Sequence, residues 1–196
     1  MDNNLFTPTI AIDNVEHFKS IPWCAKHLTA PNLIIKRPWN RNIKPNVGDA
    51  LYSVTLNTPY TIPSFLLFYP DPDATSTEPQ SAIPEVNAFI TLGPLVSGFA
   101  GVSHGGIVMS ILDEMLSIVF QVNRDRGLTK GRESMMTAYL NTTFMQPVRI
   151  PGTFLVRARL EKVEGRKWFG STWFEDANGV KLAKADGLFV MLKAKL

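Results

Sequence analysis

The chain has 196 residues, of which 45% are hydrophobic and 19% charged, and its formal net charge is +3. This length and composition suit a domain with a sizeable core and exclude a disordered or fibrous chain. The single cysteine excludes a disulfide scaffold and a cysteine-rich metal site, and the scattered basic residues argue against a nucleic-acid-binding surface.

Residues 1–46 read as an N-terminal extension with short helices, and residues 47–196 read as the main domain. In the extension, Asp13 and Glu16 have the spacing of a capping box and predict a helix that runs to Ile21. Recurring prolines then keep every later element of the extension short. The first residues lack the basic and apolar regions of a secretory signal. We therefore expect a cytoplasmic protein, with a mitochondrial location left open.

Three segments of strand length follow the extension. The apolar runs Ala50–Leu56 and Ser64–Tyr69 and the segment Glu85–Leu92 predict strands. Residues 70–84, between the last two, combine several prolines with polar residues. A loop of this length in a compact domain indicates an insertion or a lid.

A glycine-rich turn and an apolar helix occupy the middle of the chain. The turn runs from Gly93 to Gly101 and leads into the motif His104-Gly105-Gly106. From Ile107 onward, apolar side chains cover nearly the whole circumference of the predicted helix, which is typical of a buried helix. The stretch from Gly105 to Phe120 is too short to span a bilayer and carries two acids at its centre, so we expect no membrane span.

Four segments of alternating polarity come after the helix and predict strands over residues 134–145, 154–161, 168–175 and 180–192. Tight turns at Glu164-Gly165-Arg166 and Asn178-Gly179 join the last three into hairpins. Together with the strands before the helix, this pattern predicts an α+β fold. Its architecture would be one curved antiparallel β-sheet wrapped around one long central helix.

Asp113 is the first candidate for chemistry, because an acid in the middle of an apolar helix is costly unless it is used or satisfied. On a helical period it shares a stripe with Gly106, Met109, Ser110 and Ser117, which gives it a small, partly polar groove. Burial should raise its pKa toward a value useful for a general base. The alternative is a structural acid satisfied by Ser110 or Ser117.

The start of the helix supplies the second half of a candidate site. Gly105 and Gly106 should leave backbone N–H groups uncovered where a helix has unpaired donors and a partial positive charge. A carbonyl oxygen bound there would be polarised, and its tetrahedral oxyanion would be stabilised further. Close packing alone would also explain the two glycines. With a carboxylate farther along the helix, the pattern indicates an acyl-transfer site.

The motif Gly98-x-x-Gly101-Val102-x-His104-Gly105-Gly106, followed by Asp113-Glu114, resembles the signature of hotdog-fold acyl-CoA thioesterases. The similarity is to the 4-hydroxybenzoyl-CoA thioesterase superfamily, in its branch of phenylacetate-pathway and human thioesterase-superfamily proteins. The resemblance covers residues 47–193. Its later segments, in family order, are Thr137-Ala138-x-Leu140-Asn141, Gln146-Pro147, Gly152, Val163-Glu164-Gly165-Arg166-Lys167 and Leu188-Phe189-Val190.

The resemblance implies a thioester hydrolase without metal or redox cofactor, with coenzyme A as part of the substrate. It implies homodimers or tetramers whose sites lie between subunits. There the Gly105 N–H would polarise the thioester carbonyl, and the partner subunit's Asp113 would act as general base or as nucleophile. Thr137 would orient the water, and His104 would shape the turn and contact the thioester. The other residues at the substrate would be Gly106, Ser110 and Ser117, the last in the place of an assisting hydroxyl.

Two features depart from the family pattern. Many relatives carry an asparagine six residues before the histidine, where this chain has Gly98, so one oxyanion donor would be missing. An insertion over residues 124–133 also separates the helix from Thr137 and affects the alignment of that residue.

Other functions remain open at this point. The chain could hydrolyse or off-load an acyl or polyketide chain held by an acyl-carrier protein. It could also be a non-catalytic acyl-binding dimer, which the Gly98 departure allows. A hotdog dehydratase is disfavoured, because the sequence lacks an Asp-x-x-x-x-His pair.

Several other residues have competing interpretations. Glu114 is expected at an interface or in a capping role rather than in catalysis. Cys24 and His27 lack further partners for a metal site or a catalytic dyad. The basic residues after the helix form either a solvated loop or a contact for coenzyme A or phosphopantetheine phosphate, and they are Arg124, Arg126, Lys130 and Arg132. The aromatic residues expected in the core and at a dimer or acyl-binding wall are Trp168, Phe169, Trp173 and Phe174.

Overall fold

The computed structural model describes residues 15–74, 82–128 and 134–193. Its α-helices are α1 (Val15–Lys19), α2 (Pro22–Leu28) and α3 (Gly105–Asp125). Its strands are β1 (Leu33–Lys36), β2 (Ser64–Pro70), β3 (Glu85–Leu92), β4 (Ser97–Phe99), β5 (Val102–Ser103), β6 (Met135–Phe144), β7 (Gly152–Glu164), β8 (Lys167–Glu175) and β9 (Lys181–Met191). Short helical turns are η1 (Trp39–Arg41), η2 (Leu51–Thr55), η3 (Pro72–Ala74) and η4 (Pro94–Val96).

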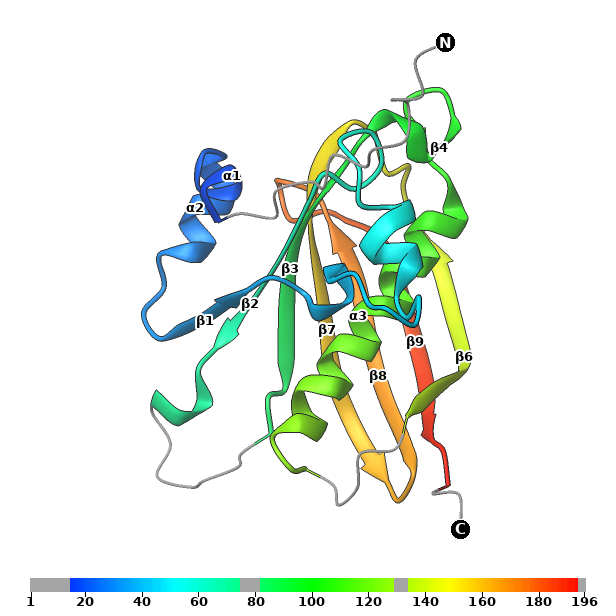
Figure 1. Cartoon of the computed structure of the whole chain (residues 1–196). Coiled ribbons are helices and arrows are strands. Elements are labelled where there is room, and N and C mark those ends of the chain that lie inside the picture. Colours follow the sequence, from blue (N-terminus) through cyan, green and yellow to red (C-terminus); the bar gives the residue numbers. More distant parts are fainter. Residues whose placement is uncertain (1–14, 75–81, 129–133, 194–196) are drawn as a thin grey trace.

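Seven strands form one antiparallel sheet in the order β1-β2-β3-β7-β8-β9-β6, and α3 lies across one face of it (Figure 1). This confirms the predicted α+β fold, with a curved sheet around one long helix. The first strand after the helix, β6, pairs with β9 at the far edge of the sheet. Strands β4 and β5 form a separate small hairpin directly before α3.

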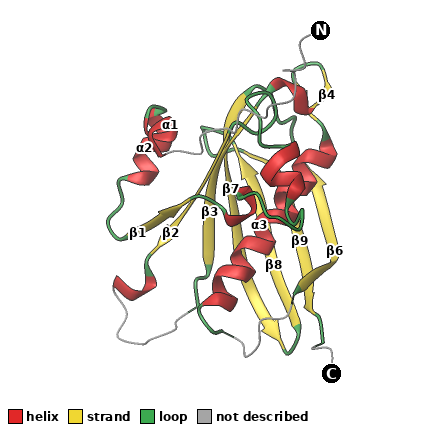
Figure 2. Cartoon of the chain, viewed as in Figure 1, coloured by secondary structure: helices red, strands yellow, loops and turns green. Residues whose placement is uncertain are grey.

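Both faces of the sheet near β2 are covered. Phe65 and Leu67 of β2 belong to the core around α3, whereas Leu66 and Phe68 pack with residues of α1 and α2 on the opposite face. Figure 2 shows α1 and α2 at the end of the sheet that β1 and β2 form. A strand buried on both faces reads as a continuous apolar run, as β2 does. The N-terminal residues thus contribute β1 and a helical cover to the sheet, and the division predicted at residue 47 stays a prediction.

Two glycines bring α3 close to the sheet. Gly170 in β8 and Gly187 in β9 are opposite each other in the register. A Cβ atom on Gly170 would lie 2.8 Å from Leu116 Cδ2, and one on Gly187 would lie 2.6 Å from Leu116 Cδ1. Any larger residue at either position would therefore push the helix outward.

The helix is longer than the sequence predicts. At 21 residues, α3 is long and apolar enough to cross a membrane by length and composition, so the argument that the stretch is too short was wrong. The packing of α3 against β7, β8 and β9 accounts for its apolar surface.

The structure corrects three expectations for the first half of the chain. The predicted helix to Ile21 is divided, since α1 ends at Lys19 and Pro22 begins α2, where proline suits the first helical turn. The predicted strand Ala50–Leu56 is wrong, because residues 51–55 form a π-helical turn. Periodicity cannot separate a strand from a buried helical turn in so short an apolar run. The sequence analysis also missed β1.

Candidate active site

Asp113 lies near the middle of α3 and faces β6. Thr137 Oγ1 donates a hydrogen bond of 2.9 Å to Asp113 Oδ1. A β-bulge between Thr137 and Tyr139 changes which side chains of β6 face the helix, so that Met135 and Leu140 both pack on the core. Thr137 precedes the bulge and shares the face of Met135, and the bulge brings Leu140 onto the same face after it.

The environment of Asp113 suits a base. Burial raises the pKa of the Asp113 carboxyl, and the hydrogen bond from Thr137 opposes part of that rise. Within the described part of the chain, no side chain donates to the second oxygen, Oδ2. The partner of the acid is Thr137, whereas the Ser110 hydroxyl lies 3.0 Å from that of Tyr52. The sequence alternative, in which Ser110 satisfies Asp113, is not what the structure shows.

The Thr137 hydrogen bond leads to a pH prediction. A catalytic base at Asp113 would act only when ionised, so kcat/KM for a reaction that uses it should fall as the pH drops through the raised pKa of this carboxyl. Replacing Thr137 by valine removes the interaction that lowers this pKa. The acidic limb of the pH profile should therefore move to higher pH. Thr143→Val, at an exposed position of the same strand, is the control, and an unmoved limb in Thr137→Val would contradict the assignment.

The turn before α3 presents one free donor rather than two. His104 is the N-cap, and its Nδ1 accepts the Gly106 N–H at 3.0 Å, so the expectation that this N–H is uncovered was wrong. The reason is ordinary N-capping, in which a side chain satisfies one of the first N–H groups of a helix. No acceptor within residues 15–74, 82–128 and 134–193 meets the Gly105 N–H. The Phe144 ring covers this glycine, since a Cβ atom there would lie 3.3 Å from Phe144 Cζ.

Gly98 has a packing role in this turn. A Cβ atom at Gly98 would lie 3.0 Å from His104 Cα and 3.1 Å from His104 Cδ2. The histidine thus fills the space that an asparagine side chain would need. The position of His104 thus explains why a glycine stands where many relatives carry an asparagine. The Gly105 N–H remains as the backbone donor at this end of the helix.

Gly105 and Asp113 are too far apart to act on one carbonyl within a single chain. Eight residues of helix separate them, which is roughly 12 Å along the axis.

Large apolar side chains are also exposed to solvent along β6, just after it and near the start of α3. Their exposed fractions are 38% for Met109, 61% for Met136, 52% for Phe144 and 51% for Met145. This surface has the character of a contact with another protein chain.

Sequence reasoning missed the residues that fix the N-terminal extension to α3. Asn40 Nδ2 donates a hydrogen bond of 2.7 Å to Glu114 Oε1. Burial, with the nearby Asp49 carboxylate in a smaller role, raises the pKa of Glu114 to about 7. The buried Arg41 guanidinium donates to the backbone carbonyls of residues 52, 56 and 62. No local pattern marks these contacts, because their partners are distant in sequence.

Among the remaining candidates, Arg126 and Cys24 have partners or surroundings away from this site. Arg126 forms hydrogen bonds with Asp73 at 2.7 and 3.0 Å. Lys130, Arg132 and part of the predicted 70–84 loop lie outside the described residues. Cys24 is buried between α2 and the sheet, and burial raises the pKa of its thiol to about 12. The described ranges contain no group of three His, Cys, Asp or Glu side chains that could hold a metal.

The aromatic residues of β8 divide between the two faces of the strand. Trp168 and Phe174 are fully buried in the core around α3. Phe169 and Trp173 lie on the other face, where the ammonium groups of Lys162 and Lys181 sit over their rings. The prediction of a core position is therefore confirmed for Trp168 and Phe174.

Comparison with known proteins relates the chain to thioesterases. The thioesterase superfamily family model matches residues 100–183, which include Gly105, Asp113 and Thr137, and confirms the resemblance found in the sequence. Verlamelin biosynthesis protein B of a Lecanicillium species is 27% identical over 203 residues, covering 90% of this chain and 87% of the relative. Acyl-coenzyme A thioesterase THEM4 of Bos taurus is 33% identical over 101 residues, covering 51% of this chain and only 38% of the relative.

Solved structures show the same fold. The Mycobacterium tuberculosis protein Rv1847/MT1895 superposes with a TM-score of 0.51 and 17% identity, covering 58% of this chain and 87% of that protein. At this identity the likeness concerns the fold alone.

Proposed function

We propose that this chain, which carries thioesterase-superfamily sequence at residues 100–183, hydrolyses an acyl-CoA thioester to a free acid and a thiol. The observation that carries the proposal is the half-buried Asp113, held by Thr137 on one oxygen, on the same helix that presents the Gly105 N–H at its start. The relative THEM4, named as an acyl-coenzyme A thioesterase, supports coenzyme A as the thiol.

In the proposed reaction, the thioester carbonyl oxygen binds the Gly105 N–H. Asp113 Oδ2 takes a proton from water while the water oxygen forms a bond to the carbonyl carbon. Negative charge moves to the carbonyl oxygen, where the N–H and the helix dipole stabilise it. Collapse of this intermediate breaks the carbon–sulfur bond, and the proton returns to the thiolate. The products are the acid and the thiol, so no other reactant is needed.

We propose that two copies of the chain form each site. The roughly 12 Å between Gly105 and Asp113 along one helix exceeds what a single carbonyl can bridge. The exposed apolar side chains of β6, together with its unpaired edge, offer the surface for a symmetric contact. One subunit would then supply Gly105 and the other Asp113.

Mixing two inactive variants tests the shared site. In a homodimer, Asp113→Asn and Gly105→Pro each inactivate both sites. A mixed dimer keeps one intact site, formed by Gly105 of the first variant and Asp113 of the second. Random exchange should restore about one quarter of wild-type activity, since half of the dimers are mixed and each has one working site of two. Activity that stays at the level of the separate variants after verified exchange would contradict this arrangement.

A hydrolysis panel tests the function itself. Acyl-CoA thioesters and the same acyl groups on an acyl-carrier protein are offered in parallel, and both the released thiol and the free acid are measured. We expect turnover with acyl-CoA. Faster turnover on the carrier protein would favour an off-loading role. Tight binding without turnover of any thioester would overturn the proposal and favour an acyl-binding protein.

A further inference from the structure

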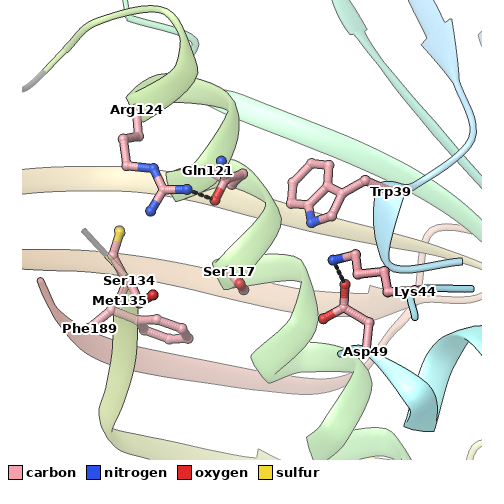
Figure 3. A pocket seen from close by; sticks show the side chains of 9 residues that line it. All are labelled: Trp39, Lys44, Asp49, Ser117, Gln121, Arg124, Ser134, Met135 and Phe189. Carbon is pink, nitrogen blue, oxygen red and sulfur yellow. Dashed lines mark hydrogen bonds and ion pairs between the residues drawn. The ribbon is translucent and has the colours of Figure 1, made fainter. Parts of the chain in front are cut away.

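A cavity of about 290 Å³ opens beside the C-terminal half of α3 (Figure 3). The helix forms one wall, and the beginning of β6 with one residue of β9 forms a second. Three residues from the end of the N-terminal extension and the segment just after it form a third, and they are Trp39, Lys44 and Asp49. The lining residues are Trp39, Lys44, Asp49, Ser117, Gln121, Arg124, Ser134, Met135 and Phe189.

The cavity continues the face of α3 that carries the proposed base. Ser117 is four residues after Asp113, so the two side chains lie one helical turn apart on the same side. On β6, Met135 is two residues before Thr137 and therefore shares its face. The cavity therefore lies about one helical turn from Asp113, on the side of α3 that faces β6.

The third wall lies outside the matched superfamily segment. Trp39, Lys44 and Asp49 all precede residue 100, where the family match begins. The hydrogen bond from Asn40 to Glu114 ties this wall to α3, and the bonds from the buried Arg41 guanidinium to the carbonyls of residues 52 and 62 join it to the segment that follows. Residues before the matched segment therefore contribute one wall of the cavity and its Lys44–Asp49 ion pair.

That chemistry is polar. Figure 3 shows Ser117 and Gln121 on the helix, with the Trp39 indole and the Lys44–Asp49 ion pair on one side of them and Arg124 farther along the helix. The lining includes two cationic side chains and one carboxylate, so its net charge is positive. A saturated hydrocarbon chain would remove these groups from water without offering them a hydrogen bond, which is unfavourable.

We propose that the cavity selects acyl groups whose chain carries an oxygen group, a hydroxyl or a carboxylate, that binds to Ser117 and Lys44. This inference rests on the proposed thioesterase function and names its substrate class. The cavity has the volume of about ten water molecules at about 30 Å³ each, which suits a chain of medium length.

The test compares three CoA thioesters of equal chain length: octanoyl-CoA, 8-hydroxyoctanoyl-CoA and suberyl-CoA. We expect kcat/KM for at least one oxygen-bearing substrate to exceed that for octanoyl-CoA at least about tenfold. Lys44→Met should lower the preference for suberyl-CoA, and Ser117→Ala the preference for the hydroxylated chain, each by about tenfold. Lys26→Met, on the exposed side of α2, is the control and should keep every ratio.

The outcomes separate this inference from the proposed function. Turnover of octanoyl-CoA as fast as that of both other substrates would overturn the polar cavity while leaving the thioesterase intact. A preference that neither Lys44→Met nor Ser117→Ala reduces would also overturn it, because the selectivity would then arise elsewhere. Failure of the wild-type chain to cleave any thioester would refute the proposed function, and this inference with it.

Discussion

Asp113→Asn is expected to lower kcat by at least about 100-fold, the scale of a lost general base. The amide cannot take a proton from water, yet it is nearly the same size and can still accept the hydrogen bond from Thr137. The substitution also removes a half-buried acid whose charged form burial disfavours. The fold should therefore persist, which the melting temperature and the circular dichroism spectrum would show.

Asp186→Asn is the matched control, since this exposed aspartate lies in β9 away from the helix N-terminus and from Thr137. It should hydrolyse acyl-CoA at the wild-type rate. If Asp113→Asn folds normally and retains near wild-type kcat, Asp113 is not the base and the proposed mechanism fails.

Gly105→Pro should lower kcat by about 10²–10³-fold, because proline removes the one N–H proposed to stabilise the oxyanion. The backbone at this position suits proline. It is the first residue of α3, where proline is favoured, and the preceding His104 has the extended conformation that proline requires, with φ −62° and ψ 133°. The loss should appear in kcat with little change in melting temperature.

Gly105→Ala distinguishes the effect of losing the N–H donor from the effect of added side-chain volume. It keeps the N–H but adds a methyl group, and the Phe144 ring must give by a few tenths of an ångström to accept it. We expect the alanine variant to retain most of the activity that proline abolishes. Equal losses in the two variants would mean that crowding against Phe144, rather than loss of the donor, explains the effect.

The sequence was sufficient for elements whose pattern is local. Apolar residues around nearly the whole circumference specified α3 as a buried helix, and period-two alternation located β7, β8 and β9 to within a few residues. Asp113 could be singled out because an acid on an apolar helix breaks a pattern that the neighbouring residues establish. His104 and Gly105 were found because a helix start has a recognisable sequence.

Contacts between distant residues required the tertiary structure. Asn40 and Glu114 are 74 positions apart, and Thr137 and Asp113 are 24 positions apart. The place of β6 at the sheet edge and the capping of Gly106 by His104 likewise depend on how elements meet. Side-chain periodicity records only which face of an element is buried. The element that packs against this face is determined only when the whole chain folds. The same packing determines the walls of the polar cavity and leaves the edge of β6 exposed.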